Sequence, residues 1–174
     1  GIKPEKQNME RLSEIANSVE KDFPLKLEII SGGNSANHEW VQSAQNVGRI
    51  NNLRLGESLL LGRETIGRNP IPGLHTEAFK LVAEVIESKE KPSLPFGEIT
   101  QNAFGDVPTF VDRGIRRRVI VALGRQDVLI SGLKPISSDL EILGASSDHL
   151  ILHSRNHTLR IGSEVEFHLD YGAL

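Results

Sequence analysis

Apolar residues recur at two different periods in the first part of the chain. In residues 4–23 they recur at helical spacing, with Glu and Lys between them. Phe23-Pro24 ends this pattern, because the residue before a proline is disfavoured in a helix. Residues 25–30 then form an apolar run with β-branched Ile29 and Ile30, which predicts a buried strand. The start of the chain therefore predicts an amphipathic helix followed by a strand.

The same order is repeated further along. Residues 37–44 predict a short helix that carries Trp40, and the apolar centre of residues 51–61 predicts a second strand. Helix, strand, helix, strand is the order of elements in a parallel α/β sheet or barrel. We therefore expect the first part of the chain to be an α/β structure.

The pattern changes after Gly62. Residues 63–73 are rich in Gly, Pro and charge, which is typical of a crossing between domains. Residues 79–88 fit two periods, because the same apolar residues alternate as in a strand and also suit one face of a helix. Propensity alone leaves both alternatives open.

Short apolar segments separated by turn residues fill the rest of the chain. They are residues 119–123, 139–143, 149–153 and 164–169. Such spacing is typical of a small all-β domain.

Composition excludes several classes of function. With 38% hydrophobic and 25% charged residues the chain is ordinary for a globular protein, and its net charge of -3 and pI near 6.1 argue against nucleic-acid binding. The basic run Arg116, Arg117 and Arg118 is interpreted as the solvated start of a strand. The absence of cysteine excludes disulfides, thiolate metal sites and a Cys nucleophile. No apolar run approaches a membrane span and no segment resembles a signal peptide, so we expect a cytoplasmic protein without a membrane partner.

Residues 31–35, reading SGGNS, are the first candidate site. Two glycines let the backbone approach a ligand, while the Asn and Ser side chains can donate hydrogen bonds to phosphate oxygens. A plain turn explains the same residues, so the motif leaves both interpretations open.

Four segments, in this order, carry a resemblance to a known family. They are Gly33-Asn34-Ser35-Ala36, then Leu53-Arg54-Leu55-Gly56-Glu57 with Leu61-Gly62 after it, then Val121-Ala122-Leu123-Gly124-Arg125-Gln126-Asp127, and Ser146-Ser147-Asp148-His149. The chain resembles the C-terminal half of the alanine racemase family of pyridoxal-phosphate enzymes, and most of all its ornithine or broad-specificity amino-acid racemase branch.

This resemblance implies a fold. Residues 1–74 would be the C-terminal part of a TIM-type (β/α) barrel, and residues 75–174 a C-terminal β-domain. Residues 79–88 would then be the strand that opens the β-domain. The expected fold class is α/β plus all-β.

The resemblance also implies a pyridoxal 5'-phosphate site. Asn34 and Ser35 would form the phosphate-binding loop, and Gly56 and Glu57 would offer backbone amides to the phosphate. Arg54 matches the arginine that approaches the pyridine nitrogen, where an always-charged guanidinium favours racemisation over transamination. A surface salt bridge is the alternative role for Arg54.

In this family the β-domain of one subunit closes the active site of its partner, so the resemblance implies a homodimer. Ser147 and Asp148 match the segment that reaches across, with Ser147 near the substrate carboxylate. A polar turn between strands is the alternative explanation for these two residues.

Arg125 stands where alanine-specific members carry a catalytic Tyr. Arginine is a poor base at neutral pH, so a second base would come from elsewhere, with Asp127 and His149 as candidates. His149 has the better intrinsic pKa, and a structural or surface role is its alternative. No metal site is expected.

The lysine that forms the Schiff base with the cofactor in this family has no match among the lysines of the chain. These are Lys3, Lys6, Lys21, Lys26, Lys80, Lys89, Lys91 and Lys134. We therefore expect a C-terminal fragment of a pyridoxal-phosphate-dependent amino-acid racemase that is inactive alone. The alternatives are a non-catalytic pyridoxal-phosphate carrier and an interaction module without cofactor. The substrate stays open among ornithine, lysine, alanine and serine.

Overall fold

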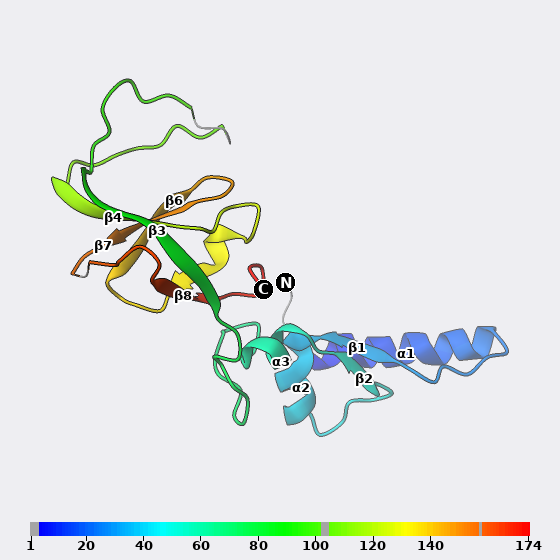
Figure 1. Ribbon diagram of the computed structural model, residues 1–174. Helices are drawn as coiled ribbons and strands as arrows, with labels where there is room; N and C mark the ends of the chain where they lie inside the picture. Colours follow the sequence, from blue (N-terminus) through cyan, green and yellow to red (C-terminus); the bar gives the residue numbers. More distant parts are fainter. Residues whose placement is uncertain (1–3, 102–104, 157) are drawn as a thin grey trace. The chain divides into compact units, whose positions relative to one another are not determined.

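A computed structural model describes residues 4–101, 105–156 and 158–174 of the chain (Figure 1). The chain divides into two compact units, Gly1–Phe79 and Lys80–Leu174. The resemblance implied a boundary between residues 74 and 75. The two units are described separately below.

The first unit begins with helix α1, Lys6–Asp22, which confirms the predicted amphipathic helix. The helix ends where Phe23, in extended conformation, precedes a proline. Its apolar face packs on the segments that lead into the two strands of the unit, where Ala16, Ile30 and Ile50 form a small buried core. Partly buried side chains surround this core: Met9, Leu12, Leu27, Trp40 and Val47.

Strand β1, Ser31–Asn34, pairs in parallel with β2, Asn52–Arg54. The strand predicted for residues 25–30 is therefore wrong, because regular pairing begins only at Ser31. Before Ser31, a side chain makes the backbone hydrogen bonds that a neighbouring strand would make. The Asn51 side chain accepts a hydrogen bond from the Ile30 N–H (2.8 Å) and donates one to the Glu28 carbonyl (2.7 Å). Burial was also mispredicted here, since 69% of Ile29 is exposed.

Three short helices follow the strands: η1, Ser35–Asn37, and α2, His38–Ser43, after β1, and α3, Glu57–Leu61, after β2. The helix predicted for residues 37–44 is confirmed. The strand predicted over residues 51–61 is wrong beyond Arg54, because glycines on both sides delimit a helix. Gly56 is the residue before α3, and Gly62 ends it in the left-handed conformation (φ 64°), which suits glycine.

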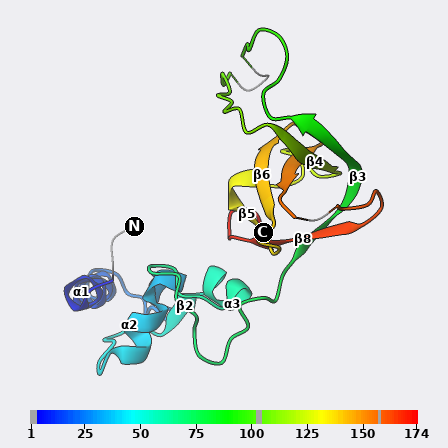
Figure 2. The ribbon, with the colours of Figure 1, turned by 90° about the vertical axis from the view of Figure 1, so that its left-hand side faces the viewer.

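The second unit is a six-stranded antiparallel sheet in the order β5-β8-β3-β4-β7-β6 (Figure 2). Its strands are β3 (Leu81–Pro92), β4 (Ile115–Val121), β5 (Leu133–Pro135), β6 (Leu140–Ala145), β7 (Leu150–Ser154) and β8 (Glu164–Leu169), with the short helix η2 (Ile130–Gly132) before β5. The strand at residues 79–88 is confirmed against the helical alternative, and the four shorter strands are confirmed with small changes of bounds. Strand β5 was not predicted.

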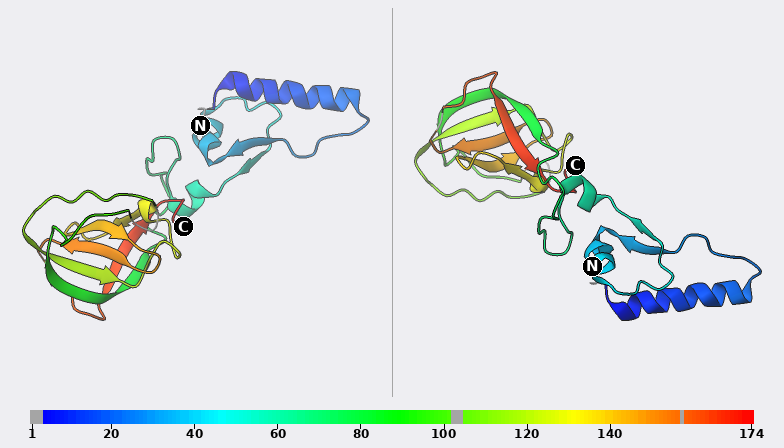
Figure 3. Two further views of the ribbon diagram at one scale, coloured as in Figure 1. Left: turned by 90° about the horizontal axis from the view of Figure 1, so that it is seen from above. Right: turned by 90° about the horizontal axis from the view of Figure 1, so that it is seen from below.

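The sheet curls into a nearly closed barrel (Figure 3). Strand β3 pairs with β8 over Leu81 to Glu84 and with β4 over Val85 to Pro92, and its register shifts between Val85 and Glu87. Strands β5 and β6, at the two edges, also approach each other. The interior is filled by side chains with less than 2% exposure: Phe167, Leu150, Leu152, Val85, Val119 and Val121.

The expected fold class, an α/β part followed by a C-terminal β-domain, is therefore confirmed. The basic run lies at the start of β4 as predicted, with Arg116 exposed and Arg117 and Arg118 half-buried. Among the described residues, no helix is long and apolar enough to cross a membrane.

Candidate functional site

The Ser35 hydroxyl joins the ends of the two parallel strands. Ser35 follows β1 directly and is only 5% exposed. Its Oγ accepts hydrogen bonds from the N–H groups of Gly56 and Ser58, each at 3.2 Å. Because both bonds use the oxygen as an acceptor, the hydroxyl hydrogen stays available to a further acceptor. The resemblance places Ser35 and Gly56 in one phosphate site, and the structure brings the two residues together.

Ser58 is a site residue that sequence reasoning missed. It lies on the first turn of α3 and is fully buried, yet its Oγ has no hydrogen-bond partner among the described residues. A buried hydroxyl without a partner is uncommon, and such groups are usually satisfied by a bound molecule or water. The strand predicted for residues 51–61 concealed this residue, because only the helix turns Ser58 back towards Ser35.

Hydrogen bonds between side-chain and backbone amide groups stabilise the loop around Ser35. The Asn34 side-chain oxygen accepts from the Ala36 N–H at 3.0 Å, which caps η1. The Asn37 amide donates to the Gly32 carbonyl. Gly33 adopts φ 114°, a conformation that side-chain-bearing residues rarely enter. The Asn34 carboxamide NH₂ therefore remains for a ligand, while its oxygen shapes the turn.

Arg54 lies at the end of β2, and its Nη1 donates to the Ser31 Oγ at 2.5 Å. Successive side chains of a strand point to opposite faces, so Arg54 lies on the other face of β2 from Leu53. The Leu53 side chain lies against Gly32, near Ile50 of the small core. Arg54 is exposed, and the contact of its guanidinium among the described residues is to a hydroxyl rather than to a carboxylate. The predicted alternative, a surface salt bridge, is not seen among the described residues.

Glu57 and Gly56 occupy the start of α3. The Glu57 carboxylate pairs with the guanidinium of Arg68, so its charge is partly neutralised beside the loop. The Gly56 N–H donates to Ser35 rather than pointing to open space. Glu57 is thus placed beside the candidate phosphate loop, with its side chain directed to Arg68.

In the second unit, two turns carry the other candidates. Residues 124–127 follow β4 and residues 146–149 join β6 to β7. The Arg125 N–H donates to the Ser146 carbonyl (2.9 Å), and the Gln126 N–H donates to the Ser147 carbonyl (3.0 Å). The structure therefore brings Arg125 and Asp127 together with Ser147, Asp148 and His149 in one cluster.

Hydrogen bonds engage both carboxylates of this cluster. Asp127 accepts from the Gly124 N–H at 2.8 Å, which shapes its own turn. Asp148 accepts from the Gln126 amide at 2.6 Å and from the Ser147 hydroxyl. His149 uses its backbone N–H to bond the Ser146 hydroxyl (3.1 Å), and its side chain is exposed. Gln126 was not singled out from the sequence, because its role depends on a contact between two turns.

Metal ligation finds no support in the described part of the chain, where no group of three or more His, Asp or Glu side chains could hold an ion. The groups that gather around Ser35 in the first unit are hydroxyls and an amide, whereas the Arg54 guanidinium bonds Ser31 at the start of β1. Such groups bind anions.

The fold is similar to one part of solved alanine racemases. The chain is similar to alanine racemase from Bartonella henselae, solved with covalently bound pyridoxal phosphate, with a TM-score of 0.61 and 18% identity over 94% of this chain and 44% of that one. It is also similar to alanine racemase from E. faecalis, with a TM-score of 0.61 and 18% identity over 93% of this chain and 42% of that one.

Sequence comparison gives particular relatives. The chain is 47% identical over 173 residues to the ornithine racemase of Acetoanaerobium sticklandii, covering 98% of the chain and 49% of that protein. It is 39% identical over 175 residues to the lysine racemase of Thermotoga maritima, covering 100% of the chain and 49% of that protein. The chain spans about half the length of these curated relatives. No protein-family profile matches it. The resemblance to the alanine racemase family that the motifs predict is confirmed.

Proposed function

We propose that this chain is part of a pyridoxal-phosphate-dependent amino-acid racemase and that its first unit holds the cofactor phosphate. The relationship to ornithine and lysine racemases supports the class of reaction. The proposed cofactor site rests on the buried Ser58 hydroxyl, which lacks a hydrogen-bond partner among the described residues. The backbone N–H of Ser58 donates to the Ser35 hydroxyl.

The residues present fit a phosphate. Ser35 and Ser58 each have a hydroxyl hydrogen to donate, and Asn34 has a free amide NH₂. The nearby carboxylate of Glu57 is paired with Arg68, which reduces its repulsion of an anion. When bound, pyridoxal phosphate supplies a conjugated ring that delocalises negative charge from the Cα of an amino acid.

Arg54 acts on the ring side of this site. A positively charged guanidinium here would disfavour a second positive charge on the pyridine nitrogen of a bound cofactor. Ser31 positions Arg54 by accepting its hydrogen bond. Ser35 and Ser58 fix the phosphate, and Arg54 biases the electronics towards racemisation rather than transamination.

The turn cluster of the second unit acts in the active site of a partner subunit in a homodimer. Ser147 lies near the substrate carboxylate there, and Gln126 holds the side chain of the adjacent Asp148 in place. His149 receives or returns the proton at Cα, because the Asp127 carboxylate already binds the Gly124 N–H. The names of the two relatives favour a basic amino acid, ornithine or lysine, as the substrate.

The phosphate site is tested by binding rather than by activity. Equilibrium dialysis of the chain with pyridoxal phosphate and with pyridoxal separates the contribution of the phosphate from that of the ring. We expect Ser35→Ala and Ser58→Ala each to weaken pyridoxal phosphate binding by about tenfold or more, since a hydrogen bond to a charged group is worth roughly 1.5–3 kcal/mol. Neither variant should change pyridoxal binding.

Ser43→Ala is the matched control, because Ser43 is an exposed serine at the end of α2 whose hydroxyl, among the described residues, bonds the Trp40 carbonyl alone. Ser58→Ala is the decisive variant, since it removes no hydrogen bond seen in the structure. Equal affinity for pyridoxal phosphate and pyridoxal, or wild-type phosphate affinity in Ser58→Ala and Ser35→Ala alike, contradicts the proposal.

A further inference from the structure

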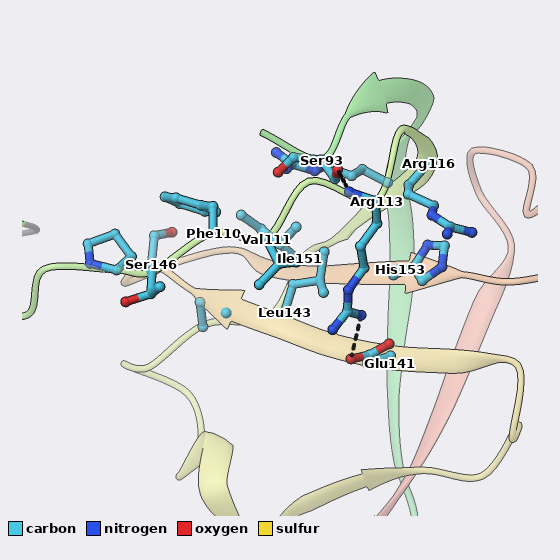
Figure 4. Close-up of a pocket in the computed structure, with 15 residues that line it drawn as sticks. Ser93, Phe110, Val111, Arg113, Arg116, Glu141, Leu143, Ser146, Ile151 and His153 are labelled. Atoms are coloured by element: carbon cyan, nitrogen blue, oxygen red, sulfur yellow. Dashed lines mark hydrogen bonds and ion pairs between the residues drawn. The ribbon is translucent and has the colours of Figure 1, made fainter. Parts of the chain in front are cut away.

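A cavity of about 550 Å³ opens on the second unit, on the face formed by β4, β6 and β7 and by the segment before β4 (Figure 4). Its volume lies in the range of small-molecule sites. Its lining includes Ser146 but none of Arg125, Asp127, Ser147, Asp148 and His149. The cavity therefore borders the turn cluster at Ser146 but is not lined by the candidate site residues of that cluster.

The two ends of the cavity differ in chemistry. Charged side chains gather at one end, and apolar side chains, together with Ser146, at the other (Figure 4). The apolar group is Phe110, Val111, Leu143 and Ile151, and the charged end holds Arg113, Arg116, Glu141 and His153.

Strand geometry builds the charged end. Arg118 of β4, His153 of β7 and Glu141 of β6 are paired in register across three neighbouring strands. Arg116 stands two residues before Arg118, and therefore on the same face of β4. Arg117 points to the other face, where it pairs with Glu90 at 3.1 Å.

Positive charge exceeds negative charge in this lining. Glu141 is the carboxylate of the lining, and it already faces Arg113 at 3.8 Å and Arg155 at 3.6 Å. Arg118 donates to the Ser93 carbonyl at 3.2 Å. Among the described residues no carboxylate pairs with Arg116. Such an excess in a chain of net charge -3 marks a site that attracts anions.

We propose that this cavity binds a small organic anion with an apolar body, represented by a medium-chain carboxylate. The carboxylate lies between Arg116 and Arg118, and the hydrocarbon covers Phe110, Val111, Leu143 and Ile151. Guanidinium groups match a carboxylate in shape and charge, and burial of the hydrocarbon supplies affinity that an inorganic anion lacks. This site does not depend on the proposed racemase function.

Isothermal titration of the chain with octanoate tests the proposal, with octanol and octylammonium as ligands that keep the tail and change the head group. Octanoate should bind at least about tenfold more tightly than either comparator, because only the anion gains the arginine contacts. Equal binding of octanoate and octylammonium overturns the proposal, since the cavity would then be an apolar cleft only.

Variants on one strand separate the two faces. Arg116→Gln and Arg118→Gln should each weaken octanoate binding by about tenfold, and the neighbouring Arg117→Gln should leave it unchanged. Glu141→Gln should strengthen binding, because it removes the carboxylate of the lining. A gain of affinity cannot come from misfolding. Loss of binding in Arg117→Gln equal to that in Arg116→Gln, or no gain in Glu141→Gln, contradicts the assignment.

Discussion

Gly124 packs so closely against Ser147 that a Cβ at residue 124 would collide with the Ser147 carbonyl group. Both residues are part of the turn cluster, and their backbones are joined by the hydrogen bonds that link residues 125 and 126 to residues 146 and 147. The position of Ser147 and Asp148 therefore depends on a glycine at residue 124, in the neighbouring turn.

Gly124→Ala should destabilise the second unit by about 1–3 kcal/mol, because backbone atoms cannot move aside as a flexible side chain would. Gly144→Ala is the matched control, since a Cβ there meets no atom within 4 Å. Urea denaturation of both variants provides the measurement. A smaller loss of stability in Gly124→Ala than in Gly144→Ala would show that the two turns are not tightly packed.

Glu64 makes the first unit sensitive to acid. Backbone N–H groups of Asn69, Gly67 and Ile66 bond its carboxylate and lower its pKa from 4.5 to about 2. Because the folded pKa is the lower one, this stabilisation is present above pH 4.5 and is lost as the pH falls towards about 2. Glu64→Gln should lose stability at near-neutral pH and show a flatter stability profile in that acid range.

Denaturant titrations at several pH values measure this effect. Glu14→Gln, on the exposed face of α1, is the matched control and should follow the wild-type profile. An unchanged acid profile in Glu64→Gln would exclude Glu64 as a source of the pH dependence. Glu87 in the second unit has its pKa lowered to about 2 by Lys89 and Lys91, so Glu87→Gln should flatten the remaining acid dependence.

Phe167 is the largest fully buried side chain of the β-domain. Phe167→Ala should cost about 3–5 kcal/mol of unfolding free energy, through lost burial and the cavity left behind. Phe96→Ala removes the same atoms from a side chain that is 94% exposed, and should change stability by less than about 0.5 kcal/mol. Thermal denaturation distinguishes the two. Similar melting temperatures for both variants would contradict the assigned core.

The last prediction concerns the lysines. Lys26 precedes β1, whereas Ser35 follows it, so the two lie at opposite ends of the strand. Lys89 and Lys91 pair with Glu87, and Lys80 pairs with Glu166. We expect no specific lysine to be labelled when the chain is mixed with pyridoxal phosphate and reduced with borohydride, and no racemisation of ornithine, lysine, alanine or serine.

Mass spectrometry maps any labelled lysine, and Lys26→Arg is the control for the lysine in the segment before β1. Stoichiometric labelling of one lysine together with racemisation would overturn this prediction. It would mean that a lysine of this chain, with Lys26 as the first candidate, has taken the catalytic role. Lys3 lies outside the described residues, and the same labelling experiment tests it.

Helices and strands whose apolar residues recur at a regular spacing were predictable from the sequence. Helix α1 and the strand at Glu164–Leu169 follow directly from the spacing of apolar residues. The start of β1 was not predictable, because it depends on where Asn52 pairs and on the Asn51 side chain that replaces a strand. Strand β5 was too short for its alternation to be visible.

Among the candidate site residues, Ser35 could be found from the loop motif and Gly56 from the resemblance to a known family, and the structure joins them. Ser58 could not be found, since its importance lies in a buried hydroxyl that no pattern records. For a related reason Gln126 was missed, and the contact that Ser31 of the loop motif makes was not foreseen. Each matters through a partner distant in sequence, Arg54 for Ser31 and Asp148 for Gln126.

The division of β3 between two neighbours sets the order in which the β-domain is completed. Leu81, near the start of the domain sequence, pairs with Phe167 near its end, whereas Val85 to Pro92 pair with the next strand along the chain. During folding, strands that are close in sequence pair early, and strands separated by a long segment pair late. During synthesis the β3-β4 hairpin can form while Leu81 to Glu84 still present an open edge. The barrel closes only after β8 has left the ribosome, so translation of the final strand determines when this domain becomes resistant to aggregation.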